Sequence, residues 1–180
     1  FVKSVGFGPE GRYIATGSED ATARVYEVAD GRLAYTVAHG APVFYASFSP
    51  NGVVFMTGSK EGTIKIWDGA TGTFINSLQG HRSNVTNVMF SPDSTRIASA
   101  SRDQTVKMYA LDAPGQETVA RTAAAIRSAS VSEDGTRAAL VLMNRTLEIR
   151  DTQTGSIVSA FAAYAPGGGY GAALSPDGRY

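Results

Sequence analysis

Three residue types that can carry out hydrolysis occur together in one stretch of this chain. His81, Ser99 and Asp103 are a histidine, a serine and an aspartate separated by 18 and four residues. In a hydrolytic triad the histidine activates the serine hydroxyl as a nucleophile, and the carboxylate orients the histidine. Tyr109 follows Asp103 by six residues and adds an aromatic ring with a hydroxyl group. A nucleophilic active site is therefore the first hypothesis to weigh.

The same set of residue types recurs at the same spacing elsewhere in the chain. A complete second set consists of His39, Thr57, Glu61 and Trp67, and a partial set consists of Thr16, Asp20 and Tyr26. One protein has little use for three triads, and the nucleophile elbow GxSxG is absent. We therefore interpret the sets as structural tetrads. In a complete set the acid accepts a hydrogen bond from histidine, the histidine contacts serine or threonine, and the network ends on the aromatic residue.

The elements that position these sets repeat with a regular period. Equivalent apolar residues are spaced by 41, 42, 41 and 43 positions, and each precedes a turn such as SPNG or SPDG; they are Phe7, Phe48, Phe90, Val131 and Leu174. Each repeat contains about four short runs in which apolar and polar residues alternate, the pattern of half-buried strands. Repeats of this length with four strands each predict a propeller.

The chain resembles the WD-repeat family of β-propellers. The resemblance rests on GH near the start of a repeat, SPDG in the middle and SxDxTxxxW toward the end, and it is strongest in the second and third repeats. It implies an all-β fold of four-stranded antiparallel blades, with four blades and a partial fifth in a ring of about seven. It also implies that the tetrads are structural.

The repeats predict the blade boundaries. We expect blade 1 at 1–38, blade 2 at 39–79, blade 3 at 80–122, blade 4 at 123–163 and the start of blade 5 at 164–180. The fourth repeat is degenerate, because its tetrad positions hold Thr122, Leu140, Asn144 and Arg150. We expect it to depend on apolar packing through Ala138, Leu140, Leu142 and Ile149. Because the sequence starts at Phe1 and stops within a repeat, we expect a longer chain; a ring completed by a second copy and a small propeller are the alternatives.

Composition limits the classes of function. Lys plus Arg and Asp plus Glu both total 16, so the net charge is zero and gives no overall signal for nucleic acid or an anionic membrane. There is no cysteine, and no apolar run approaches the roughly 20 residues that a membrane span needs. Zinc, calcium and P-loop spacings are also absent, so we expect no cofactor and no metal. The interpretation is a soluble intracellular protein, cytoplasmic or nuclear, without membrane contact.

The resemblance also implies where partners bind. In the family, the face with the histidine-bearing loops and the turns after the second strands is the usual docking surface. Here that face would carry the residues before each tetrad acid and the neighbouring loop, namely Glu19, Lys60, Arg82, Ser83, Asn84, Arg102 and Met143. The alternative is that these are ordinary solvated loop residues.

The expected function is a non-catalytic scaffold for other proteins, as a subunit or adaptor of a larger complex. Two alternatives stay open. One is an RNA- or ribosome-associated propeller subunit, suggested by Lys60, Arg82 and Arg102, although the zero net charge does not favour nucleic acid. The other is a propeller enzyme whose active site lies in blades outside this sequence.

Overall fold

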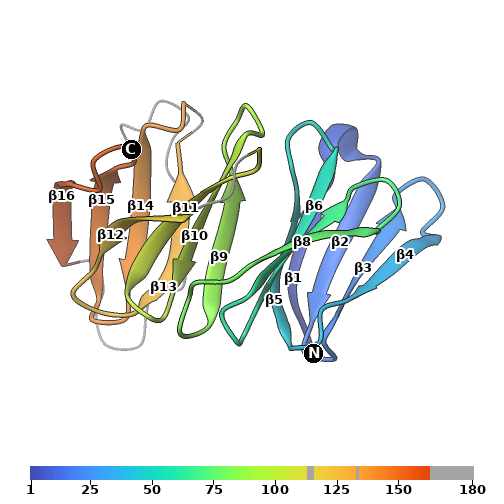
Figure 1. The fold of residues 1–180 in the computed structure, drawn as a ribbon, viewed down its shortest axis with the longest axis horizontal. Helices are drawn as coiled ribbons and strands as arrows, with labels where there is room; N and C mark the ends of the chain where they lie inside the picture. The colour runs from blue at the N-terminus through green and yellow to red at the C-terminus, as the bar shows by residue number, and fades with distance from the viewer. Residues whose placement is uncertain (113–115, 133, 163–180) are drawn as a thin grey trace.

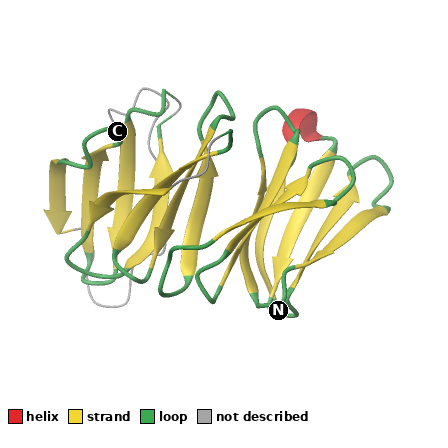
Figure 2. Cartoon of the chain, viewed as in Figure 1, coloured by secondary structure: helices red, strands yellow, loops and turns green. Residues whose placement is uncertain are grey.

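Strands form nearly all of the regular structure. The computed structural model describes residues 1–112, 116–132 and 134–162. Within these residues, sixteen strands and one short 3-10 turn, η1 (Pro9–Gly11), are present (Figure 2). The alternation of apolar and polar residues along the strands produces this result, because successive side chains point to opposite faces of a sheet.

The strands form four separate antiparallel sheets of four strands each, in chain order. The first sheet contains β1 (Val2–Phe7), β2 (Tyr13–Ser18), β3 (Thr22–Glu27) and β4 (Leu33–Ala38). The second contains β5 (Val43–Phe48), β6 (Val54–Ser59), β7 (Ile64–Asp68) and β8 (Phe74–Leu78). The third contains β9 (Val85–Phe90), β10 (Arg96–Ser101), β11 (Thr105–Ala110) and β12 (Gln116–Arg121). The fourth contains β13 (Ile126–Val131), β14 (Arg137–Leu142), β15 (Thr146–Asp151) and β16 (Ile157–Ala162).

Consecutive sheets pack face to face through their first strands. β1 lies against β5, β5 against β9, and β9 against β13, so the sheets follow one another along the long axis of the molecule (Figure 1). Three apolar clusters fill the three junctions and contain, for example, Phe48 and Phe55, Val85 and Ile97, and Ala129 and Leu140. Gly58 permits close approach at the second junction, because a Cβ there would lie 3.0 Å from the Val85 and Val88 side chains.

The first strand of every sheet is irregular at the same place. The pairing register shifts after its first residue, leaving Lys3, Phe44, Thr86 and Arg127 as the extra residues of β-bulges. A bulge bends the strand and redirects one side chain. These bulges were not predicted from the sequence.

The predicted fold class is confirmed: the described chain is all-β and consists of four-stranded antiparallel sheets. Each sheet lies within one predicted blade range, but the blade boundaries and the size of the ring stay predictions. The predicted start of blade 5, at 164–180, lies outside the described residues.

Candidate functional site

The third sheet brings His81, Ser99 and Asp103 together. The Ser99 hydroxyl lies 2.7 Å from Nε2 of His81, and Nδ1 of His81 lies 2.9 Å from Oδ2 of Asp103. Asp103 also accepts hydrogen bonds from the backbone N–H of Arg82 at 2.9 Å and from the Thr105 hydroxyl at 2.6 Å. Ser99 is only 1% exposed, so its hydroxyl is out of reach of a substrate. This geometry suits a buried structural network better than a nucleophile.

The electrostatics of this network keep the histidine neutral. Burial lowers the pKa of His81, and the hydrogen bond to Asp103 only partly opposes that change. Burial acts to raise the pKa of Asp103, but the hydrogen bonds from Thr105, the Arg82 N–H and His81 outweigh it and set the pKa at about 2. Asp103 is therefore an ionised acceptor, and His81 donates from Nδ1 and accepts at Nε2.

The aromatic end of this network differs from the sequence-based expectation. Tyr109 is 2% exposed, and its hydroxyl makes no hydrogen bond within the described chain. Burial raises the pKa of Tyr109; the Ser99 hydroxyl opposes that rise but is not in hydrogen-bonding geometry. The ring therefore contributes apolar packing, and the bonded network stops at Ser99.

The second sheet arranges the same residue types differently. Nδ1 of His39 lies 2.7 Å from the Thr57 hydroxyl, which also accepts a hydrogen bond from Nε1 of Trp67 at 2.9 Å. The predicted acid, Glu61, is exposed and makes no side-chain hydrogen bond or ion pair in the described chain. Nε2 of His39 is consequently buried without a partner, and burial lowers the pKa of His39 to about 4.

The first sheet does not join its three predicted members. Asp20 accepts from the Thr22 backbone at 3.0 Å and from Arg24 at 2.9 Å, and the Thr16 hydroxyl donates to the Arg24 carbonyl at 3.4 Å. No hydrogen bond joins Tyr26 to either residue in the described chain. These members share a sheet but not a network.

The fourth sheet contains a polar network that the sequence analysis missed. Arg150 and Glu148, both on β15, form a buried ion pair with 2.7 Å between Nη2 and Oε2. Arg150 also donates to the Gly155 carbonyl at 2.7 Å and to the Arg121 carbonyl at 3.1 Å. The expectation of apolar packing alone was therefore incomplete. Residues at the first two tetrad positions do not join the ion pair: Leu140 packs in an apolar cluster, and Thr122 donates to backbone carbonyls.

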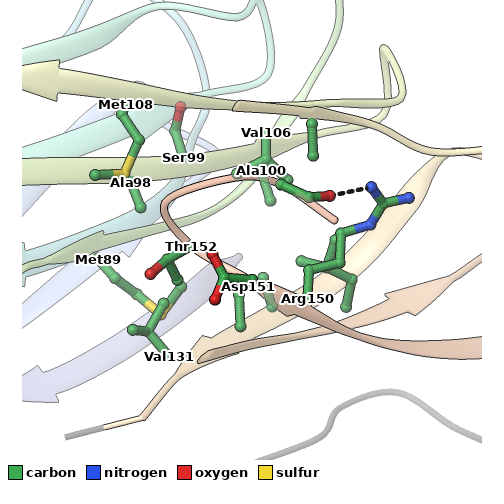
Figure 3. A pocket seen from close by; sticks show the side chains of 15 residues that line it. Met89, Ala98, Ser99, Ala100, Val106, Met108, Val131, Arg150, Asp151 and Thr152 are labelled. Carbon is green, nitrogen blue, oxygen red and sulfur yellow. Dashed lines mark hydrogen bonds between the residues drawn. The ribbon is translucent and has the colours of Figure 1, made fainter. Parts of the chain in front are cut away.

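A small cavity adjoins Arg150, at the junction of the third and fourth sheets. Its volume is about 30 Å³, and its walls are mostly apolar, with Met89, Met108 and Val131 among them (Figure 3). The donors of Arg150 point to Gly155, Arg121 and Glu148. The cavity therefore has an apolar lining without a free cationic group. The space is left open because several of the lining side chains in the facing strands are small alanines.

The predicted docking residues, which we call the rim, are Glu19, Lys60, Arg82, Ser83, Asn84, Arg102 and Met143. In each sheet the rim residue after the second strand is fixed by one equivalent backbone bond. The N–H groups of Glu19, Lys60, Arg102 and Met143 donate to the carbonyls of Phe1, Pro42, Asn84 and Ala125, at 2.9, 2.9, 3.0 and 2.8 Å. All four side chains are exposed. The structure therefore holds four different side chains in equivalent positions.

The turn that follows Lys60 in the second sheet lies against the loop of the third sheet that carries Arg82 and Ser83. Gly62, in the turn that follows Lys60, approaches the loop of Arg82 and Ser83 so closely that a Cβ on Gly62 would lie 2.4 Å from the His81 carbonyl oxygen. Glu19 differs from the other charged rim residues, because its carboxylate pairs with Lys3 at 2.9 Å. That hydrogen bond, opposed by burial, lowers the pKa of Glu19.

No group of three or more His, Cys, Asp or Glu side chains within 1–112, 116–132 and 134–162 is arranged to hold a metal ion. No helix in the same residues is long and apolar enough to cross a membrane.

Comparison with known proteins places these observations in a family. The family described as "WD domain, G-beta repeat" matches residues 1–27, 31–68 and 72–109. Over 110 residues the chain is 35% identical to guanine nucleotide-binding protein subunit beta-5b of Danio rerio, covering 59% of this chain and 28% of that protein. Over 47 residues it is 49% identical to a ribosome biogenesis protein BOP1 homolog of Leishmania braziliensis, covering 26% of this chain and 6% of that protein. The chain thus spans less than a third of the length of either relative. With the family matching more than half of the chain, this protein belongs to the WD-repeat family.

Proposed function

We propose that this chain is a non-catalytic platform that binds other proteins, as a subunit or adaptor of a larger complex, and that the rim is its docking surface. The observation that carries the proposal is the set of four equivalent backbone bonds that present Glu19, Lys60, Arg102 and Met143. The framework is repeated, whereas the exposed side chains differ in charge and polarity. A surface of this kind suits recognition of a specific partner.

The tetrads support a non-catalytic role. His81, Ser99 and Asp103 satisfy one another in a buried network, and His39 bonds Thr57 below the surface. The hydrogen-bonding groups of these side chains are therefore used to stabilise the sheets. An enzyme of this family would need its reacting groups elsewhere, and our proposal includes neither a cofactor nor a metal. We place the function inside the cell, in the cytoplasm or nucleus, a location with which the cysteine-free sequence is compatible.

An RNA- or ribosome-associated role is the second candidate. Lys60, Arg82 and Arg102 give the rim positive charge, and one similar protein is described as a ribosome biogenesis protein. The zero net charge makes this candidate weaker, because non-specific RNA binding depends on the excess of positive charge.

Co-purification tests the docking surface in the full-length protein. We expect the double variant Lys60→Glu/Arg102→Glu to lose partners that the parent protein retains. The matched control is Arg12→Glu/Arg96→Glu, which makes the same change of charge at the opposite ends of strands β2 and β10. If both variants retain every partner, the rim is not the docking surface. Loss of all partners after nuclease treatment of the parent complex would favour the RNA-associated role.

A further inference from the structure

We infer that the rim accepts an acidic segment of a partner protein, with a carboxylate or phosphate bound by Arg82 and Arg102. This inference rests on the proposed function, because it names the chemistry of the partner at the same surface. The distribution of charge over the folded chain, which the composition does not show, supports this inference.

Unpaired positive charge is concentrated at the rim end of the sheets. Elsewhere in the described chain, five basic side chains have carboxylate partners, as in the pairs Lys3–Glu19, Arg24–Asp20 and Arg137–Asp151. Two exposed ones at the opposite end of the sheets, Arg12 and Arg96, form no ion pair with the described residues. By contrast, five exposed basic side chains at the rim end form no ion pair or side-chain hydrogen bond with the described residues: Lys60, Arg82, Arg102, Arg121 and Arg145. One carboxylate at this end, that of Glu61, also forms no ion pair with the described residues. The rim end therefore attracts anions, although the net charge of the chain is zero.

Ionised carboxylates are exposed at the opposite ends of the sheets. Asp93 and Asp134 lie in the turns between the first and second strands of the third and fourth sheets, and both are exposed. Hydrogen bonds from Ser91 and Thr95 lower the pKa of Asp93 to about 2, and those from Ser132 and Thr136 lower the pKa of Asp134. Both carboxylates therefore stay ionised and place negative charge at the end opposite the rim, where Arg12 and Arg96 are also exposed.

The side chains around Arg82 and Arg102 are donors of the kind that binds an oxyanion. The backbone of Arg82 is fixed by its bond to Asp103, and that of Arg102 by its bond to the Asn84 carbonyl. The side chains of Ser83 and Asn84, which follow Arg82 on the same loop, make no hydrogen bond in the described chain. Two guanidiniums, a hydroxyl and an amide are thus available on one anchored loop and turn. Guanidiniums bind carboxylates and phosphates through two parallel hydrogen bonds.

The rim favours a protein segment over RNA. Proteins that bind single-stranded RNA usually combine positive charge with aromatic rings on which bases stack, and the seven rim residues include no aromatic side chain. Instead the rim includes Met143, an apolar side chain that is 43% exposed, and Arg145 follows two residues later. A segment that carries acidic residues and one apolar side chain matches this combination.

Fluorescence anisotropy with defined probes tests the inference on the full-length protein. The probes are a labelled peptide of Glu with one central Leu, the same peptide with Gln in place of Glu, the same peptide with phosphoserine in place of Glu, and a polyuridine RNA of equal length. We expect the Glu and phosphoserine peptides to bind and the Gln peptide and RNA to bind at least about tenfold more weakly. The stronger of the two acidic peptides identifies carboxylate or phosphate as the preferred anion.

Two variants decide whether the binding belongs to the rim. Arg82→Gln/Arg102→Gln should weaken binding of the acidic peptides by about tenfold or more, whereas Arg12→Gln/Arg96→Gln should leave it unchanged. Equal weakening by both variants, or tighter binding of RNA than of either acidic peptide, would overturn the inference. The outcomes for the two proposals differ: if Lys60→Glu/Arg102→Glu loses native partners but no acidic peptide binds, the docking surface stands and the acidic partner is wrong.

Discussion

At the level of the residue, the one methylene group by which Glu61 is longer than Asp103 changes the hydrogen bonding of the tetrad. Asp103 accepts from the N–H of Thr105 at 3.0 Å and from its hydroxyl at 2.6 Å, which holds the carboxylate near His81. Aspartate forms this local turn readily because its side chain is short. Glu61 occupies the same position in the second sheet, and there the N–H of Thr63 instead bonds the Ser59 hydroxyl at 3.3 Å. The longer side chain is left in solvent.

Asp103→Ala should destabilise the protein by about 1–3 kcal/mol, because His81 and the Arg82 N–H would lose their acceptor. Thermal or denaturant unfolding measures the change. Asp93→Ala is the matched control in the same sheet, since Asp93 bonds only within an exposed turn. If both variants unfold with equal ease, the buried network does not stabilise the sheet as we describe.

His39 should make stability depend on pH in a defined window. Its pKa is about 4 in the folded protein, compared with 6.5 ordinarily, because burial disfavours the charged ring. The unfolded chain therefore binds the proton first as the pH falls. The stabilisation is complete above about pH 6.5 and is lost progressively toward pH 4, by at most about 3 kcal/mol.

His39→Asn tests this pH dependence. Asparagine can keep the hydrogen bond that Nδ1 makes to Thr57 but does not titrate. We expect the free energy of unfolding of this variant to fall less steeply between pH 6.5 and 4 than that of the parent protein. A remaining slope is expected from His81, whose pKa is also lowered by burial. An unchanged slope in His39→Asn would show that the ring is not buried as a neutral group.

At the level of the element, the sequence predicted strands better than polar networks. Alternation and turn residues located the strands, because the side-chain period of two is visible in any half-buried strand such as Val43–Phe48. The Glu148–Arg150 pair was not predicted, since alternate charged residues on a strand resemble a solvated face. The bulges at Lys3 and Phe44 were missed for a similar reason: they depend on pairing with the next strand and leave no local pattern.

Arg150→Met tests how far the fourth sheet depends on its ion pair. This change leaves the buried Glu148 carboxylate without a partner, and we expect it to destabilise the protein by about 3–5 kcal/mol. The double variant Glu148→Leu/Arg150→Met removes both charges and should recover most of that loss. Unfolding curves of the two variants measure the difference. Equal destabilisation of both would show that packing around Arg150, and not its charge, is what matters.

At the level of the whole molecule, the positions of the charged residues decide the electrostatic preference more than their numbers do. Equal numbers of acidic and basic residues suggested no electrostatic preference, yet the folded chain gathers five exposed basic side chains without ion pairs at the rim end. The repeat predicted which residues form the rim, but their pairing could not be predicted. Whether Lys3 neutralises Glu19, for example, depends on contact between a bulge and a turn.

The first sheet leaves an apolar face uncovered. Val5 and Phe7 are 71% and 70% exposed, whereas Ala46 and Phe48, at the equivalent positions of the second sheet, are 3% and 7% exposed. In the second sheet these positions pack against the preceding sheet. The repeat therefore predicts that another blade covers the face of Val5 and Phe7 in the full-length protein, as ring closure requires.

Phe7→Lys in the full-length protein tests that coverage. A covered phenylalanine contributes about 3 kcal/mol or more through burial, so we expect a lower melting temperature. The control is Ile75→Lys on the outer strand β8, where the side chain is 55% exposed and its replacement should change stability little. If the two variants melt at the same temperature, the face is open in the full-length protein and ring closure does not use it. A larger loss in Phe7→Lys would mean that the junctions described for the four sheets continue beyond them.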